Sequence, residues 1–260
     1  MCLLVLAWRA HPRYRLVVAA NRDEFHERPA APLAPWPPHG EVLAGRDLRA
    51  GGAWLALDRA RRFGVVTNFR ELQPARAGAP SRGNLIPRFL AGRHGAGEFF
   101  GALEPEAPGY SGFNLLLADE ESLWYGSNRA APFARELTAG VYGLSNELLD
   151  TPWPKLLRVR RGFEAWLGEP SARAPASLFE LLMDRTQSAG DAGLRESGLP
   201  RELEQVLSAP FVVHPTYGTR CSSVLLLQND GGVYLGERRF DAQGAPAGET
   251  EFRLNPGEWP

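Results

Sequence analysis

The chain opens with CLLVLAWRAHPRYRLVVAANRDE at residues 2–24, and this stretch decides the class of the fold. Residues 2–9 and 14–21 are apolar and rich in leucine and valine, and the turn-like tripeptide His11-Pro12-Arg13 separates them. Two apolar runs joined by a short polar turn are typical of a β-hairpin. The sequence therefore predicts that the chain begins in a strand and that residues 21–24 end the second strand.

Cys2 stands at the start of the first predicted strand, directly after the initiator methionine. Removal of Met1 gives this residue a free α-amine beside its thiol. An α-amine titrates near ~7.7–8.0 and a thiol near ~8.5, so the amine can accept the thiol proton close to neutral pH. The residue therefore has the parts of a self-contained nucleophile and base. The alternative is an inert cysteine that follows the initiator by chance.

Asn21, Arg22, Asp23 and Glu24 bring four polar side chains back toward Cys2, because the two strands of a hairpin pair with each other. A carboxylate in this place can hold an α-ammonium, and a guanidinium can favour the thiolate and bind a carboxylate or phosphate of a ligand. These residue types therefore indicate a site. The alternative is a solvated strand end with local ion pairs.

Two later segments place polar groups at predicted strand ends: YGLSN at residues 142–146 and YGTRCSS at 217–223. Asn146 can donate a hydrogen bond to an oxyanion, and Arg220 can bind an anionic group. The alternatives are a turn or helix cap for Asn146 and a structural salt bridge for Arg220. We expect Cys221 to lie close to the site, where oxidation links it to Cys2; the alternative is a buried, inert thiol.

Apolar periodicity and turn residues predict a layered α+β fold in one domain spanning residues 1–260. Residues 29–40 hold five prolines and predict an extended loop, and this segment and residues 187–198 are the candidate linkers. The sequence shows no regular alternation of strand and helix, which disfavours a parallel sheet. Further predicted strands are 54–57, 63–68, 112–118, 121–126, 140–146, 220–228, 233–239 and 252–254, and predicted helices are one capped by Ser81 and those at 98–103, 153–167, 178–183 and 199–207.

The composition excludes several classes of protein. The 260 residues are 44% hydrophobic and 23% charged, and a net charge of −1 with a pI near 6.5 gives no field that attracts nucleic acid or an anionic membrane. No apolar run approaches the roughly 20 residues of a membrane span. The apolar run at the N-terminus has no basic segment before it and is too short for an export signal. The two cysteines fit a reducing compartment. We therefore expect a cytoplasmic protein.

The common signatures of nucleotide, zinc and serine-hydrolase sites are absent from the sequence. The five histidines show no metal-ligand spacing, so no metal site is predicted. Among the 29 basic residues only Lys155 is a lysine.

Seven short motifs occur in an order that resembles the NRDE family, also called the Transport and Golgi organisation 2 family. The resemblance runs from Cys2 to about Leu227, which is most of the chain. An ordered set of this size is far more specific than the tetrapeptide at residues 21–24 alone. The motifs are Cys2, Asn21-Arg22-Asp23-Glu24, Gly51-Gly52-Ala53-Trp54-Leu55, Thr67-Asn68, Ser81-Arg82-Gly83-Asn84-Leu85, Gly143-Leu144-Ser145-Asn146 and the segment from Tyr217 to Ser223.

The resemblance implies a fold related to N-terminal nucleophile hydrolases, a four-layer αββα sandwich. It implies that Cys2 is the nucleophile, that Asp23 orients it, that Asn68 and Asn146 line the oxyanion hole, and that Arg220 is the late arginine of the site. Candidate ligand contacts are Asn21, Arg22, Glu24 and Cys221.

In one position the sequence departs from those hydrolases. They carry an arginine before the asparagine of the second-strand motif, and this chain has Ala20 there, with Arg22 displaced next to Asp23. Adjacent side chains on a strand face opposite ways. The sequence therefore leaves open whether Arg22 faces Cys2.

Three functions follow from these residues. The first is cleavage of an amide or thioester through Cys2, with no cofactor required. The second is non-catalytic binding or trafficking of haem or of acyl-coenzyme A and lipid, for which basic residues hold the anionic groups, and His214 or Cys2 are the candidate haem ligands. The third is a structural interaction module. The first two expect a small anionic or acyl-bearing molecule as the partner, and the sequence leaves the oligomeric state open.

Overall fold

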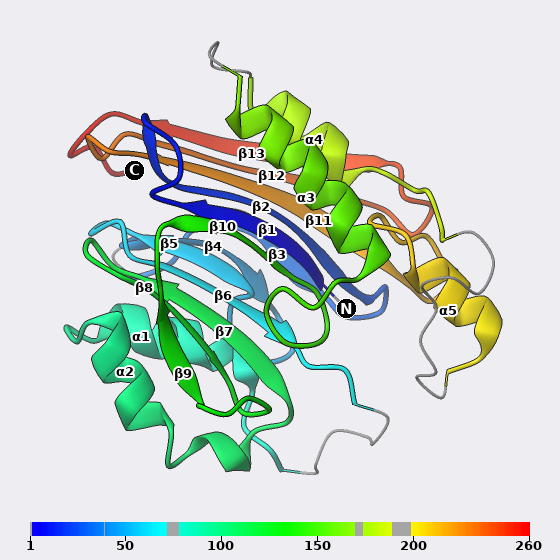
Figure 1. The fold of residues 1–260 in the computed structure, drawn as a ribbon, viewed down its shortest axis with the longest axis horizontal. Helices are drawn as coiled ribbons and strands as arrows, with labels where there is room; N and C mark the ends of the chain where they lie inside the picture. Colours follow the sequence, from blue (N-terminus) through cyan, green and yellow to red (C-terminus); the bar gives the residue numbers. More distant parts are fainter. Residues whose placement is uncertain (1, 39, 72–77, 170–173, 189–198) are drawn as a thin grey trace.

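The computed structural model describes residues 2–38, 40–71, 78–169, 174–188 and 199–260. Two antiparallel sheets stack face to face, and helices cover their outer faces (Figure 1). In the first sheet the order is β10 (Gly140–Leu144), β1 (Cys2–Trp8), β2 (Tyr14–Phe25), β11 (Tyr217–Gln228), β12 (Val233–Phe240) and β13 (Pro246–Leu254). The predicted hairpin of β1 and β2 therefore lies inside this sheet.

The second sheet follows the chain from one strand to its neighbour. Its strands are β3 (Ala30–Pro35), β4 (Val42–Asp47), β5 (Leu55–Asp58), β6 (Phe63–Asn68), β7 (Phe113–Ala118), β8 (Leu123–Ser127) and β9 (Ala134–Leu137). Every pairing in both sheets is antiparallel. This agrees with the short turns that the sequence places between its apolar runs.

Two helices cover each sheet. The helices α1 (Leu85–Ala91) and α2 (Ala96–Leu103) lie on the second sheet, and α3 (Pro154–Leu167) and α4 (Ala176–Leu182) lie on the first (Figure 1). Helix α5 (Arg201–Leu207) lies beside one end of the first sheet, and short 3-10 turns occur at η1 (Arg82–Asn84) and η2 (Ala107–Gly109).

Three apolar layers show that the fold is a four-layer αββα sandwich. Along β1, Leu4 and Leu6 face the second sheet, whereas Leu3 and Val5 face α3 and α4. This alternation is the period of two that a strand imposes on its side chains. A third layer packs α1 and α2 on the second sheet. The predicted fold class is therefore confirmed.

The proline-rich segment 29–40 differs from the prediction of an extended loop, because it contains β3. This strand lies at the edge of its sheet and pairs with β4 in an irregular register between Ala31 and Ala34. Proline lacks an N–H group and is tolerated on an edge strand, where one side needs no partner. The strands β4 and β9 were also not predicted.

Two further expectations need correction or lie outside the described residues. Ser81 was predicted to cap a helix, but its side chain makes no capping hydrogen bond, and α1 begins at Leu85 after the turn η1. The candidate linker 187–198 falls largely on residues 189–198, which lie outside the described part of the chain.

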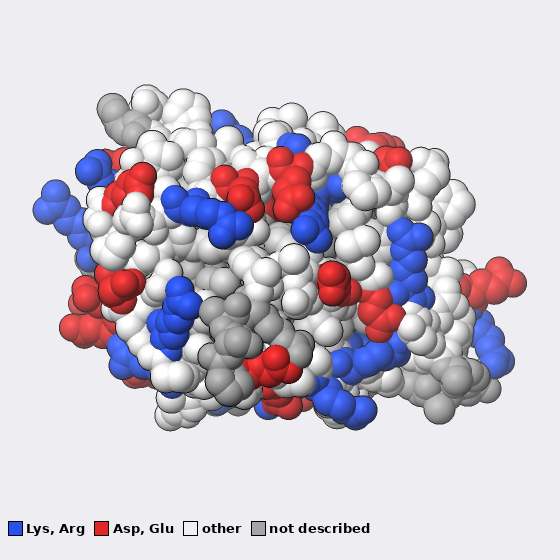
Figure 2. Space-filling model, turned by 90° about the horizontal axis from the view of Figure 1, so that it is seen from above, with Lys and Arg blue, Asp and Glu red and all other residues white. Residues whose placement is uncertain are grey.

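The surface seen in Figure 2 mixes acidic and basic side chains, and no extended area of one sign is visible among the described residues on this face. This pattern agrees with the net charge of −1. No helix within the described ranges is long and apolar enough to cross a membrane.

Candidate active site

Cys2 and Arg22 lie on the same face of the first sheet. They are directly opposite each other in the pairing of β1 with β2. Both have the parity of Leu4 and Val18, whose side chains point toward the second sheet. Arg22 therefore faces the same side as Cys2, which answers the question that the sequence left open. Asp23 has the opposite parity and points toward the helical layer.

A pocket of about 590 Å³ opens beside Cys2 between the ends of the two sheets. This volume lies within the ~300–1,000 Å³ that is usual for small-molecule sites. Both sheets and the turn η1 contribute charged or polar side chains to its wall. The polar and charged residues at the wall are Arg22, Asp23, Glu24, Glu27, Arg28, Asp47, Arg49, Asn68, Ser81, Arg82 and Ser111, and Trp54 adds an aromatic surface.

Arg22 is only 6% exposed, and acidic and aromatic groups surround its guanidinium. It lies over the ring of Trp54, 4.5 Å from the ring centroid, and its Nη2 is 3.8 Å from a Glu24 oxygen and 3.7 Å from an Asp47 oxygen. A cation between an aromatic ring and two carboxylates is strongly held. Arg22 therefore joins the two sheets behind Cys2, and Glu24 and Asp47 balance its charge.

The surroundings of Cys2 favour the protonated form of its thiol. Burial raises its pKa, and the charge of Asp23 raises it further, whereas the Asp23 backbone N–H, which hydrogen-bonds the sulfur, and the charge of Arg22 lower it. A buried thiol without enough nearby positive charge remains neutral. Attack by this sulfur therefore requires a base.

Asp23 is the buried carboxylate closest in sequence to this thiol. Its Oδ1 accepts a hydrogen bond of 2.7 Å from the Thr219 hydroxyl on β11. Burial raises the pKa of Asp23, and the charges of Lys155 and Arg22 lower it. The carboxylate is therefore anchored by one neighbouring strand, and it influences the charge of Cys2 from the helical side.

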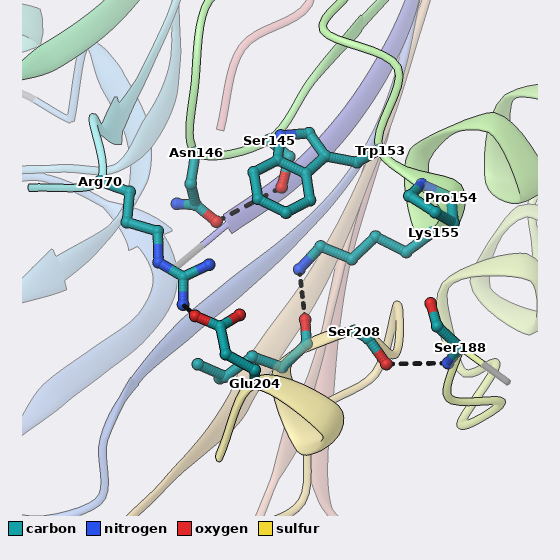
Figure 3. A pocket seen from close by; sticks show the side chains of 10 residues that line it. Arg70, Ser145, Asn146, Trp153, Pro154, Lys155, Ser188, Glu204 and Ser208 are labelled. Atoms are coloured by element: carbon teal, nitrogen blue, oxygen red, sulfur yellow. Dashed lines mark hydrogen bonds and ion pairs between the residues drawn. The ribbon is translucent and has the colours of Figure 1, made fainter. Parts of the chain in front are cut away.

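Lys155, on α3, belongs to this group of charges, and the sequence reasoning missed it. The side chain is 3% exposed, and its Nζ donates a hydrogen bond of 2.9 Å to the Leu207 carbonyl (Figure 3). Burial lowers the pKa of Lys155, and the charge of Asp23 raises it. The available signal was its helical spacing with the buried Val159 and Phe163, because a lysine on an apolar stripe is unusual.

The lone lysine allows a direct titration. Protein labelled with [ε-¹³C]lysine gives one lysine signal, and we expect its midpoint to lie below the ordinary value of about 10.4, because burial disfavours the ammonium. The Asp23→Asn variant is expected to lower it further, since the charge that favours the ammonium is removed. The unfolded chain binds the extra proton, so stability rises with pH between the folded value and ~10.4. An ordinary midpoint, or one unchanged in the variant, contradicts this charge coupling.

The two predicted oxyanion residues are neighbours, but only Asn68 lines the Cys2 pocket. Asn146 lines the small cavity of Figure 3, where its Nδ2 donates to the Asn68 carbonyl at 3.3 Å. The residue before Asn146 contacts Cys2 directly, because the Ser145 hydroxyl donates a hydrogen bond of 3.2 Å to the Cys2 carbonyl. The segment 143–146 therefore positions the backbone of Cys2, and Asn68 is the asparagine that faces the ligand space.

Asn21, a predicted ligand contact, lies outside the lining of the pocket. Its Nδ2 donates to the carbonyls of Leu182 and Pro210 at 2.8 and 3.0 Å, and its Oδ1 accepts from the Ser222 hydroxyl at 2.6 Å. All three bonds are buried. The side chain therefore ties β2 to the helical layer and to β11.

Arg220, the predicted late arginine, also lies outside the pocket lining. It occupies an irregular position of β11, between Thr219 and Cys221. Its Nη1 donates to three carbonyls of the chain just beyond and at the end of β2, those of Phe25, His26 and Arg28, at 3.0, 3.1 and 3.3 Å. In this structure Arg220 therefore holds the turn after β2, and its catalytic role stays a prediction.

The predicted disulfide between Cys2 and Cys221 is wrong, because β2 lies between them. Arg22 pairs with Cys2 on one side and with Cys221 on the other. Two strand spacings separate their Cα atoms by about 10 Å, and a disulfide needs about 7 Å or less. Cys221 instead hydrogen-bonds Glu237, a buried carboxyl whose Oε1 accepts from the Leu33 N–H across the two sheets.

His214 lies outside the lining of the Cys2 pocket. Its Nδ1 faces the Thr216 hydroxyl at 3.3 Å, and its carbonyl lies 2.9 Å from the Nε2 of His26. Within the described ranges no three histidine, cysteine, aspartate or glutamate side chains come together as a metal site would require. Of the two candidate haem ligands, Cys2 is therefore the one that faces the pocket.

Solved structures of two hydrolases are similar to this chain. One is an N-acylethanolamine-hydrolyzing acid amidase ortholog from Caenorhabditis elegans, with 12% identity, a TM-score of 0.44 and coverage of 86% of this chain and 92% of its own. The other is a mutant conjugated bile acid hydrolase from Clostridium perfringens, with 9% identity, a TM-score of 0.47 and coverage of 98% and 93%.

Sequence comparisons are more specific. The profile of the family described as Transport and Golgi organisation 2 matches residues 1–242. The Bos taurus homolog of that name is 34% identical, covering 98% of this chain and 99% of its own length. The Homo sapiens homolog is 33% identical over 92% of each chain, and the Drosophila melanogaster protein is 27% identical over 100% of this chain and 95% of its own. The chain therefore belongs to the Transport and Golgi organisation 2 family.

Proposed function

We propose that this protein is a cysteine hydrolase that cleaves an amide or thioester bond of a small acyl-bearing molecule. The observation that carries the proposal is the position of Cys2, which starts a strand at the wall of a pocket of about 590 Å³ and has its sulfur held by the Asp23 backbone. Loss of Met1 gives Cys2 the α-amine that the protonated thiol needs as a base.

The proposed reaction has two halves. The α-amine accepts the thiol proton, the sulfur attacks the acyl carbonyl carbon, and the bond from that carbon to nitrogen or sulfur breaks as the leaving group takes the proton from the α-ammonium. Water then attacks the acyl-thioester, which releases a carboxylic acid and restores the thiol. Asp23 holds the α-ammonium, and the Asn68 amide donates to the oxyanion. The reaction requires no cofactor, and we place it in the cytoplasm.

Intact-mass measurement tests this proposal. The protein is purified from the cells that make it, and its mass is expected to lack one methionine. It is then mixed with a set of acyl anilides and acyl-pantetheine thioesters and quenched with acid. The expected result is a mass increase equal to one acyl group, mapped to Cys2. Retention of Met1, or the absence of any acyl adduct and any product across the set, contradicts the proposal.

The second candidate is a non-catalytic carrier of haem or of acyl-coenzyme A and lipid. The raised pKa of the Cys2 thiol favours it, because binding needs no thiolate. In this case the Cys2→Ala variant binds acyl-coenzyme A as tightly as the unaltered protein, and neither protein forms product. Absence of binding below roughly 100 μM, about −5.5 kcal/mol, counts against a carrier.

A further inference from the structure

Arg82 differs from the other arginines that line the Cys2 pocket. Arg22 and Arg28 both approach Asp47, and Arg49 lies 3.5 Å from a Glu27 oxygen. In the part of the chain that the structure describes, no carboxylate lies within 4.0 Å of the Arg82 guanidinium. Arg82 therefore lacks the direct ion pair that the other three pocket arginines make, and the charges of Glu71 and Glu24 act on it from farther away.

The backbone around Arg82 is fixed against the opposite wall of the pocket. The Gly83 carbonyl accepts a hydrogen bond of 3.0 Å from the Ala53 N–H. Gly52 packs so closely on Gly83 that a Cβ at position 52 would lie 2.4 Å from the Gly83 carbonyl carbon. This contact explains the glycine at position 52, whereas a Cβ at position 83 would lie 3.3 Å from its nearest neighbour, the Ala53 carbonyl oxygen. The contact holds the turn η1, and with it Arg82, at a fixed place beside Ala53 and Trp54.

The guanidinium is positioned by the backbone, and within the described residues it donates one hydrogen bond. Its Nη1 donates to the Gly112 carbonyl at 2.8 Å, and a guanidinium has five N–H groups. It is partly buried, and burial lowers its pKa, whereas the carboxylates of Glu71 and Glu24 raise it. Arginine remains protonated even so. Because Arg82 and Cys2 line the same pocket, an anion bound at Arg82 would lie in the space that Cys2 borders.

We propose that Arg82 binds an anionic group, a carboxylate or a phosphate, of the molecule that enters the Cys2 pocket. The planar guanidinium matches both groups with paired hydrogen bonds. If Cys2 hydrolyses an acyl bond, as proposed above, Arg82 restricts the substrates to anionic amides or thioesters. The binding role itself does not require turnover.

Alkylation of Cys2 by two reagents tests this role. Iodoacetate carries a carboxylate and iodoacetamide does not, and with both the thiolate displaces iodide. The ratio of their rates at Cys2, followed by peptide mass mapping, cancels any change in the thiolate fraction. In the Arg82→Gln variant we expect the ratio of iodoacetate to iodoacetamide to fall about fivefold or more, because the guanidinium no longer attracts the carboxylate. Arg82→Lys is expected to keep most of it.

Arg49→Gln is the matched control. Arg49 lines the same pocket, but its side chain is 54% exposed and paired with Glu27. We expect its ratio to change less than twofold. An unchanged ratio in Arg82→Gln overturns the proposal. A fall in Arg49→Gln as large as that in Arg82→Gln also overturns it, because it indicates that the overall positive potential of the pocket attracts the carboxylate. Thermal unfolding of each variant verifies folding, and Arg82→Lys tests the charge if Arg82→Gln fails to fold.

Competition separates the two kinds of anion. Inorganic phosphate or hexanoate is added during alkylation, and the anion that fits Arg82 slows iodoacetate in the unaltered protein but not in Arg82→Gln. Protection by neither overturns the proposal. Because the assay needs neither removal of Met1 nor an acyl substrate, it can succeed where the hydrolase proposal fails. Conversely, hydrolysis of neutral substrates together with an unchanged alkylation ratio in Arg82→Gln would support the hydrolase proposal and contradict this role for Arg82.

Discussion

Replacement of Cys2 by alanine is expected to lower hydrolysis of an acyl amide or thioester by roughly a thousandfold or more, because the sulfur is the atom that forms the acyl intermediate. Losses of this size are typical when the nucleophile of a hydrolase is removed. The measurement is the initial rate on the substrates that give an acyl adduct. A Cys2→Ala protein that retains a rate within tenfold of the unaltered one contradicts a nucleophilic role.

Cys2→Ser is the matched control for this experiment. Serine replaces the sulfur nucleophile with an oxygen, and the second residue stays small. Intact mass can therefore verify that Met1 is removed equally in all three proteins.

We also expect the rate of the unaltered protein to rise with pH above neutrality, because burial raises the pKa of the Cys2 thiol and the thiolate forms only as the pH approaches that value. A rate that falls over this range contradicts thiolate attack.

Gly52→Ala is expected to lower the free energy of unfolding by about 1–3 kcal/mol, the usual cost of overpacking. The new Cβ would lie 2.4 Å from the Gly83 carbonyl carbon and 2.9 Å from the Asn84 nitrogen, and both are backbone atoms that cannot rotate away. The same displacement is expected to reduce the iodoacetate preference, because Arg82 moves with Gly83. Urea unfolding and the alkylation ratio measure the two effects.

Gly101→Ala provides the comparison for that substitution. Gly101 is an exposed residue of α2, and a Cβ at this position meets nothing within 4 Å. Alanine is the better helix former by up to ~1 kcal/mol, so this variant is expected to be as stable as the unaltered protein or more so. Equal stability of the two alanine variants would show that the contact between Gly52 and Gly83 is not tight.

The sequence predicted the layers of the fold because the layers depend on local patterns. The continuous apolar runs in residues 2–9 and 14–21 mark strands that are buried on both faces, and the apolar stripe from Leu156 to Trp166 marks the helix that covers them. Edge strands carry weaker patterns. Only one side of β3 pairs with another strand, so the strand tolerates prolines, and its sequence has the composition of a loop.

The candidate site was harder to predict, because it depends on which strands become neighbours. Cys2, Asp23 and Asn68, which the motifs mark at the ends of strands, line one pocket, and their catalytic roles stay predictions. Arg220 and Cys221 could not be placed, since their positions depend on β11 lying beyond β2 and on an irregular register at Arg220. Arg82 stood within a recognised motif, but its lack of a carboxylate partner is visible only in three dimensions.

The order of strands in the first sheet has a consequence for biosynthesis. The hairpin of β1 and β2 lies between β10 and β11, and about 190 residues separate Phe25 from Tyr217. A two-stranded hairpin is marginally stable alone, so it waits for partners that the ribosome adds roughly 10–40 s later at ~5–20 residues per second. We therefore expect the removal of Met1, on which the proposed hydrolase depends, to occur during translation, before β11 joins the sheet that holds Cys2.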